Sequence, residues 1–152
     1  MLRGSCSCGE VTYHLSSGPM FVHCCHCHDC QTLSGSAYLL NALIETDRVN
    51  VEGALVDVHL STPSGHGKIV RRCTACKDAI YSHYLIRGKS VAFLRVGTLD
   101  EPSLCPPDVQ IFTESKQSWV PLSTDIPAFE AFYDFKDLWP EESWSRMQAA
   151  VS

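Results

Sequence analysis

Alternation of polar and apolar positions recurs along most of the chain, and this is the period of half-buried β-strands. Residues 10–15 alternate in this way, and residues 20–22 lead as an apolar strand into a run of cysteine and histidine. Six more strand-like segments follow: 37–44, 48–52, 56–60, 68–71, 79–85 and 90–96. Pro63 to Gly67 is typical of the turn of a hairpin. The pattern predicts a mainly β fold.

Helical signals are few and fall late in the chain, which becomes richer in proline and aromatic residues after Gly97. Residues 126–132 are one helix candidate, because Pro127 suits a first helical turn. Residues 141–151, behind Pro140, are another. With 152 residues and no internal repeat or long linker, the sequence predicts one domain over residues 1–152.

Charge and hydropathy exclude several classes of function. The net charge is -5, whereas a nucleic-acid binder usually carries a basic excess, so we expect no nucleic-acid partner. The longest basic cluster, Lys68 with Arg71 and Arg72, is interpreted as a solvated face or local ion pairs. No stretch approaches the roughly 20 apolar residues of a membrane span, and no apolar signal segment opens the chain. We therefore expect a cytoplasmic protein with no membrane partner.

Nine cysteines are many for this length, and their odd number without a secretion signal argues against a disulfide framework. Clustered thiols in a reducing compartment more often bind metal. Two cysteines stand apart from this expectation: Cys24 is interpreted as a small buried residue and Cys105 as an incidental thiol. The scattered histidines are interpreted as ordinary strand or surface residues: His14, His59, His66 and His83.

The first predicted zinc site combines two short cysteine pairs. Cys6 and Cys8 are separated by one residue, and Cys73 and Cys76 by two. Zn²⁺ prefers four tetrahedral ligands, and four thiolates close its coordination shell. A closed site contributes folding energy and leaves no open position for chemistry. The alternative is two unrelated pairs of buried thiols.

The second predicted zinc site lies in the densest run of metal-binding residues, from Cys24 to Cys30. Cys25, Cys27 and Cys30 are the favoured ligands, and Cys24, Cys27 and Cys30 form an alternative register. Three protein ligands leave a fourth position for water or substrate, which is the catalytic pattern for zinc. A second structural site, closed by His23, His26 or His28, is the competing interpretation.

With both clusters identified, the chain resembles the glutathione-dependent formaldehyde-activating enzyme family, whose fold is also described as Mss4-like and which includes centromere protein V-like proteins. The matching segments span residues 3 to 132: residues 4–11, 25–30 with 34–36, 72–76, 97–100 and 118–120. The resemblance implies a β-rich fold with two zinc ions. It assigns Cys6, Cys8, Cys73 and Cys76 to the structural zinc, and Cys25, Cys27 and Cys30 to the catalytic zinc. It also implies the reversible joining of formaldehyde to the thiol of glutathione.

The family usually has glycine directly after the second cysteine pair, but Lys77 stands there. Glycine suits a turn with positive φ, and lysine tolerates that conformation less well. We therefore expect an altered turn with metal binding retained.

The leading interpretation of function is a zinc-dependent carbon–sulfur lyase that acts on a thiol and an aldehyde, in a chain that can form a homodimer. His26 and His28 are candidates for proton transfer, with orientation of neighbouring groups or plain exposure as the alternative. Backbone N–H groups of residues 34–36 can bind a polar substrate or form a simple turn. Aromatic residues Phe112 and Trp119 are expected in the core or lining a pocket, and Arg72 and Lys116 are candidates for binding substrate carboxylates.

Two other functions compete with the lyase. One is a non-catalytic zinc-binding protein-interaction module, which the acidic net charge does not exclude. The other is a thiol redox sensor, which would require exposed, metal-free cysteines of low pKa. Clustering of seven cysteines argues against the sensor.

Overall fold

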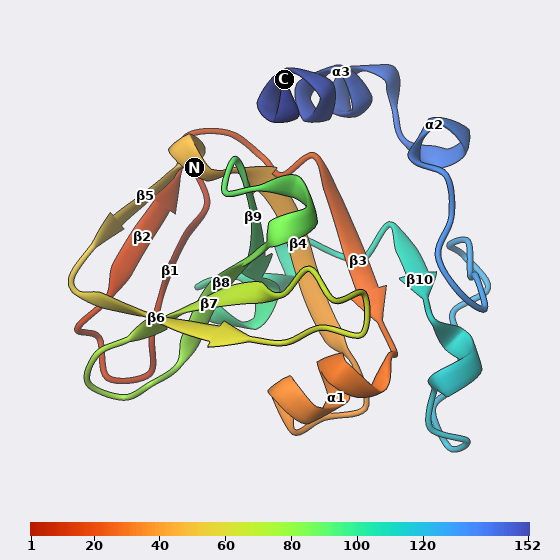
Figure 1. Ribbon diagram of the computed structural model, residues 1–152, viewed down its shortest axis with the longest axis horizontal. Coiled ribbons are helices and arrows are strands. Elements are labelled where there is room, and N and C mark those ends of the chain that lie inside the picture. The colour runs from red at the N-terminus through yellow and green to blue at the C-terminus, as the bar shows by residue number, and fades with distance from the viewer.

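The computed structural model describes all 152 residues, and ten strands form two sheets (Figure 1). The smaller sheet has the order β1-β2-β5, and the larger has the order β10-β3-β4-β9-β8-β7-β6. The strands are β1 (Arg3–Ser5), β2 (Thr12–Leu15), β3 (Phe21–Cys25), β4 (Leu39–Glu45), β5 (Val49–Glu52), β6 (Leu55–Leu60), β7 (Lys68–Cys73), β8 (Ala79–Tyr84), β9 (Val91–Arg95) and β10 (Val109–Ile111). The helices are α1 (His28–Ser34), α2 (Phe135–Leu138) and α3 (Glu141–Val151). The prediction of a mainly β fold with few short helices is confirmed.

All eight strands predicted from the sequence are present, and the bounds of each lie within three residues of the prediction. The predicted hairpin joins β6 to β7 in antiparallel register from Leu55 opposite Cys73 to Leu60 opposite Lys68. The short strands β1 and β10 were not predicted. Strand β10 lies at the edge of the large sheet and pairs in parallel with β3, a strand that comes much earlier in the sequence.

The predicted helix over residues 126–132 is wrong. This segment runs extended beside β10, where the Gln110 N–H donates to the Pro127 carbonyl and the Phe129 N–H donates to the Gln110 carbonyl, each at 2.9 Å. Phe129 packs against the second apolar cluster in this conformation. An isolated helix of seven residues is marginal in water, so pairing with a sheet edge is the more stable arrangement. The predicted helix over residues 141–151 is confirmed as α3.

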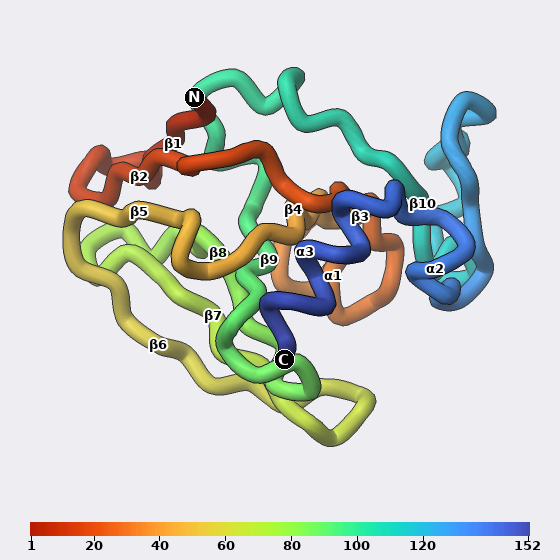
Figure 2. Tube along the Cα trace, turned by 90° about the horizontal axis from the view of Figure 1, so that it is seen from above, coloured from red at the N-terminus to blue at the C-terminus, as the bar shows by residue number.

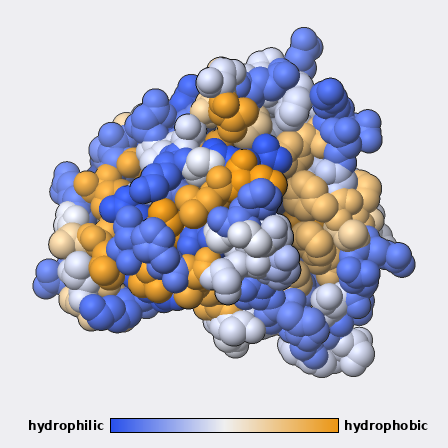
Figure 3. All heavy atoms as spheres, viewed as in Figure 1, coloured by the Kyte–Doolittle hydropathy of each residue, from blue (hydrophilic) through white to orange (hydrophobic).

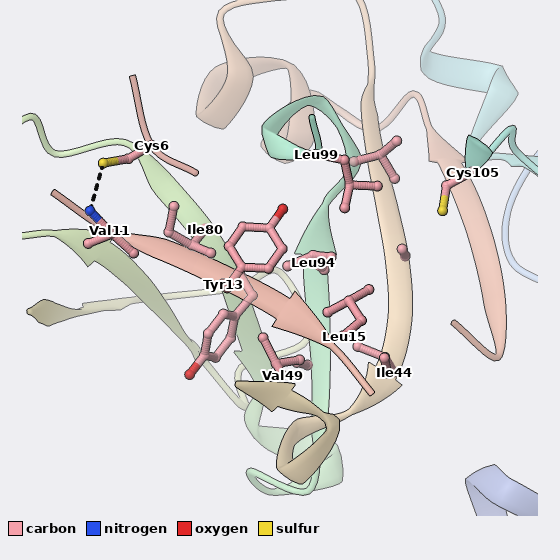
Figure 4. Packing of buried hydrophobic residues seen from close by; sticks show 14 of the residues in the cluster. Cys6, Val11, Tyr13, Leu15, Ile44, Val49, Ile80, Leu94, Leu99 and Cys105 are labelled. Carbon is pink, nitrogen blue, oxygen red and sulfur yellow. Dashed lines mark hydrogen bonds between the residues drawn. The ribbon is translucent and has the colours of Figure 1, made fainter. Parts of the chain in front are cut away.

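Two apolar clusters pack on opposite faces of the large sheet. The first fills the space between the two sheets and includes Tyr13 and Leu15 from β2 with Ile44 and Leu94 from the large sheet (Figure 4). The second contains Phe21, Cys25, Cys30 and residues of α2 and α3. In Figure 1, α1 and α3 lie at opposite ends of the strands of the large sheet, α1 at the bottom and α3 at the top.

Figure 2 shows the same arrangement from above, with the segment between β10 and α2 extending at one end of the molecule. In the space-filling view, apolar residues are spread over the left and centre of the visible face among hydrophilic ones, and moderately apolar residues lie at its right (Figure 3). None of the helices has the length and apolarity that a membrane crossing requires.

Candidate metal centres

Four cysteine sulfurs converge where the small sheet meets the large one. Cys6 and Cys8 lie in the turn after β1, while Cys73 ends β7 and Cys76 lies in the turn before β8. All four Sγ atoms lie within 4.8 Å of one another. The Cys6 and Cys8 sulfurs are 3.5 Å apart, and the Cys8 and Cys73 sulfurs are 3.8 Å apart.

These separations suit a tetrahedral metal ion. Sulfurs held 2.3 Å from a central zinc at tetrahedral angles lie about 3.8 Å apart. Backbone N–H groups also point at the sulfurs: Val11 donates to Cys6 at 3.3 Å, drawn in Figure 4, and Ala75 donates to Cys73 at 3.4 Å. A hydrogen bond from the Asp78 backbone N–H is the main cause that lowers the pKa of Cys76 to about 6. Donors of this kind stabilise thiolates, so this group fits a bound cation such as zinc.

The turn after Cys76 has the conformation expected of glycine. Lys77 has a φ of 68°, in the left-handed region, although it carries a side chain. Its N–H donates to the Cys73 carbonyl at 3.1 Å, and its Nζ reaches the Thr74 carbonyl. The turn therefore keeps its geometry, and the substitution of lysine introduces backbone strain instead of an altered path.

A second group of three sulfurs lies at the junction of β3 and α1. Cys25 is the last residue of β3, Cys27 is the N-cap of α1, and Cys30 lies in the first turn of that helix. The sulfurs of Cys25 and Cys27 are 3.4 Å apart, and all three lie within 4.8 Å of one another. Cys25 and Cys30 are buried, whereas Cys27 is half-buried and can be approached from solvent.

The thiols of this group differ in pKa. Hydrogen bonds from Cys25 and Cys30 lower the pKa of Cys27 to about 2, and the hydrogen bond to Cys27 is the main cause that raises the pKa of Cys25. The Cys30 N–H at the start of α1 also donates to the Cys27 sulfur at 3.4 Å. The group thus stabilises one thiolate by itself, and a cation is needed to hold all three sulfurs deprotonated. This donor set also fits zinc.

No histidine nitrogen belongs to this group. His26 is buried with its Nε2 3.6 Å from the sulfur of Cys24, and its ring packs against Tyr38. His28 is exposed at the start of α1. His23 is buried and its Nε2 is 2.7 Å from the Tyr133 hydroxyl. None of the three histidines proposed as closing ligands therefore belongs to the group of three sulfurs.

Cys24 also lies apart from the group, because neighbouring residues of a strand point to opposite faces. It is buried, as is Cys105, and neither joins a metal-binding group. The structure thus brings together the sulfurs of the favoured register, Cys25, Cys27 and Cys30.

A buried polar row that the sequence analysis missed lies on the same sheet face as Cys25. Cross-strand pairing places Asn41 of β4, Arg95 of β9 and Ser82 of β8 side by side on this face. The Arg95 guanidinium donates to the Asn41 Oδ1 at 2.6 Å and also to the Ser82 hydroxyl. The sequence feature that could have predicted this row is a polar residue inside an otherwise apolar strand, as at Asn41 and Arg95.

The interpretation of Lys68 as part of a solvated face or a local ion pair is wrong. Its side chain is 0% exposed and forms an ion pair with Asp29, 39 residues away in α1. The Lys68 ammonium also lies 5.6 Å from the centre of the Tyr84 ring. Arg71, by contrast, pairs with Asp57 directly across the hairpin, as a local ion pair should.

None of the remaining sequence candidates belongs to either group of sulfurs. Trp119 is 74% exposed, so its expected place in the core or a pocket is wrong, and Phe112 is half-buried beside the second apolar cluster. The Lys116 ammonium donates to the Val120 carbonyl, and Arg72 donates to the Lys77 carbonyl.

The backbone N–H groups of residues 34–36 are engaged within the turn. Gly35 is the left-handed C-cap of α1, and its N–H donates to the Gln31 carbonyl. The Ser36 N–H donates to the Ser34 hydroxyl at 3.2 Å. The segment is therefore the end of a helix, and the expected substrate-binding role is not supported there.

Comparison with known proteins agrees with the cysteine pattern. A sequence model of the family described as glutathione-dependent formaldehyde-activating enzyme matches residues 1–115, a region that contains all seven clustered cysteines. No curated protein matches the chain. A crystal structure of a Rhodobacter sphaeroides protein is similar at 15% identity with a TM-score of 0.48, over 84% of this chain and 99% of that one.

Proposed function

This chain belongs to the glutathione-dependent formaldehyde-activating enzyme family, and we propose that it is a zinc-dependent carbon–sulfur lyase. Its reaction would join a thiol to an aldehyde, as in the formation of S-hydroxymethylglutathione from glutathione and formaldehyde. A bond forms between the thiol sulfur and the carbonyl carbon, and the thiol proton ends on the new hydroxyl oxygen. The reverse reaction breaks that bond and returns the proton to sulfur.

The contrast between the two cysteine groups is the observation that carries this proposal. One group has four sulfurs and is complete as a tetrahedral site, while the other has three sulfurs and no fourth side-chain ligand. We propose that Cys6, Cys8, Cys73 and Cys76 hold a structural zinc, and that Cys25, Cys27 and Cys30 hold a catalytic zinc. Cys25, Cys27 and Cys30 would leave one coordination position of a bound zinc open, and the chemistry that zinc would supply there is a lowered pKa for an entering thiol.

The surrounding residues support such chemistry by fixing the three sulfurs. Cys30 is held in α1, and the neighbouring Asp29 is anchored to Lys68 of β7. The Gln31 amide donates to the His26 carbonyl at 2.7 Å and to the Ser115 carbonyl at 3.0 Å, so the turn between Cys25 and Cys30 is tied down on both sides. A metal site that carries out a reaction benefits from rigid ligands of this kind.

A non-catalytic zinc-binding module that binds another protein is the alternative function. The exposed indole of Trp119 favours it, because exposed tryptophan is enriched at protein interfaces. This function requires two bound zinc ions but no acceleration of any thiol–aldehyde reaction.

The deciding experiment measures zinc content and thiol–formaldehyde exchange together. We expect two zinc ions per chain and faster exchange of formaldehyde with glutathione, followed by NMR. Cys25→Ser should remain folded, bind one zinc ion and lose the acceleration. Cys24→Ser is the matched control, because Cys24 is adjacent and buried but outside the group, and it should keep both zinc ions and the activity. If the wild-type protein accelerates exchange with none of several thiols, the lyase proposal is refuted.

A further inference from the structure

Arg95 is a buried cation whose hydrogen-bond partners are all neutral and which has no carboxylate within ion-pair distance. The residue is 6% exposed, and its guanidinium donates to the Asn41 amide oxygen, the Ser82 hydroxyl and the Phe93 carbonyl. The four ion pairs of the protein are Arg48–Glu45, Lys68–Asp29, Arg71–Asp57 and Arg146–Glu45, so none involves Arg95. Burial lowers the pKa of Arg95, which reflects the poor solvation of its charge.

A buried guanidinium without a direct ion-pair partner is unfavourable, and proteins seldom retain one. A carboxylate in the fork of a guanidinium forms two charge-assisted hydrogen bonds and would remove this penalty. The position of Arg95 in the fold indicates the source of such a carboxylate.

Arg95 lines a pocket of about 290 Å³ at the end of the large sheet. The other walls come from the last turn of α1, from Tyr38, Leu39 and Leu40 around the start of β4, and from Ala79 and Gly97. Arg95 is the one charged residue among these walls. An anion therefore has a cationic partner here, whereas an ammonium group has no carboxylate to pair with.

The pocket shares two of its walls with the three-cysteine group. Helix α1 contributes Cys30 at its first turn and Leu33 and Ser34 at its last. Leu39 lies directly across from Cys25 in the pairing of β3 with β4. A molecule with its sulfur at the cysteines can thus extend along α1 and place a second group beside Arg95.

We propose that Arg95 binds a carboxylate of the thiol substrate in this pocket, and that this carboxylate has no ammonium group beside it. Within glutathione, the glycyl carboxylate meets this description and the γ-glutamyl carboxylate, which adjoins an ammonium, does not. This inference rests on the proposed function for the identity of the thiol. It goes further by stating which thiols the site selects: those that carry a separate carboxylate.

The test is a direct binding measurement that needs no reaction. S-methylglutathione, which has no free thiol, is titrated into the zinc-loaded protein and followed by NMR, in parallel with its glycyl ethyl ester. We expect the ester to bind about tenfold more weakly or worse, as loss of a charged hydrogen-bond pair predicts. Arg95→Met should bind the acid as weakly as the ester, and Arg95→Lys should lie between the two proteins.

Lys136→Met is the control, because Lys136 is an exposed cation on α2 that lies outside the pocket. It should bind the acid as the wild-type protein does. Equal binding of acid and ester by wild-type protein, or no binding of either, would overturn the proposal. So would a loss of binding in Lys136→Met that Arg95→Met does not show.

The ester titration of wild-type protein keeps the proposal testable even if Arg95→Met does not fold. The exchange assay separates the two proposals. Carboxylate-dependent binding without any acceleration of thiol–formaldehyde exchange would support the Arg95 pocket and refute the lyase. Acceleration that is equal for 3-mercaptopropionate and the uncharged 2-mercaptoethanol would support the lyase and count against the pocket.

Discussion

Replacing Asp29 with asparagine would leave the ammonium of Lys68 buried without a counter charge. The two partners of this ion pair differ in exposure, since the Lys68 side chain is 0% exposed and that of Asp29 is 30% exposed. Removing either partner breaks the same contact. The free energy of unfolding should nevertheless respond differently, because only Lys68 would be left without access to water.

The magnitudes follow from that difference. Breaking a buried ion pair so that one charge stays unpaired costs about 3–5 kcal/mol. The asparagine oxygen and the nearby ring of Tyr84 offset part of this, so Asp29→Asn should cost about 2–4 kcal/mol. Lys68→Met removes the buried charge and leaves a carboxylate that water can reach, which should cost about 1 kcal/mol. Asp29→Asn should therefore destabilise the protein more, by about 2 kcal/mol.

The assay is urea unfolding of zinc-loaded protein, with the double variant completing a thermodynamic cycle. The double variant should be close in stability to Lys68→Met alone. Zinc content must be equal in all four proteins, because Asp29 lies between Cys27 and Cys30 and a lost zinc ion would also lower stability. If Lys68→Met is as destabilising as Asp29→Asn, the packing of the lysine stem and not its charge determines the stability, and the reasoning fails.

Three further predictions concern stability. Cys6→Ser should abolish cooperative unfolding monitored by circular dichroism, because structural zinc in small domains contributes about 10–16 kcal/mol; a folded variant that retains two zinc ions would contradict this. Lys77→Gly should raise the free energy of unfolding by about 1 kcal/mol in urea titrations, since it removes a side chain at a φ of 68°, and no gain would mean that the lysine contact with Thr74 offsets the strain. Arg146→Met should cost about 2 kcal/mol at pH 7, because Arg146 donates to Glu45 at 2.9 and 2.6 Å. Burial acts to raise the pKa of Glu45, but the hydrogen bonds from Arg146 lower it overall. The stabilisation by this ion pair is therefore present at neutral pH and is lost as pH falls through the lowered pKa of Glu45. If the destabilisation by Arg146→Met is as large in acid as at pH 7, the assignment is refuted.

The sequence predicted what depends on local spacing. Strand bounds followed from alternation, and the convergence of the Cys6 and Cys73 turns followed from the ligand number that zinc requires. The polar row behind the second cysteine group was missed because its members come from separate strands. Asn41, Ser82 and Arg95 meet through the register of three strands, and hydrophobic period alone does not specify which strands pair.

The same limit explains the errors at Lys68 and Trp119. A lysine at the start of a strand reads as solvated, yet α1 brings Asp29 to it from 39 residues away. A tryptophan reads as core, yet the chain beyond residue 115 lies outside the region that matches the family. For Lys68, burial is decided by a tertiary contact that no local pattern contains, and for Trp119 the local pattern likewise does not specify whether the chain around it packs over the indole.

The different roles proposed for the two cysteine groups follow from how far apart their members lie in sequence. Cys8 and Cys73 are 65 residues apart, so a metal ion that joins them links the turn after β1 to the large sheet and closes a long loop. Cys25, Cys27 and Cys30 are neighbours in sequence, and a metal ion there closes almost no loop, so it adds little to the organisation of the fold. The chain instead surrounds this local group with groups from distant strands, Lys68 from β7 and Arg95 from β9. Lys68 is paired with Asp29, and Arg95 has no carboxylate partner, so a buried cation remains available near this group, which suits a site that receives an anionic thiol.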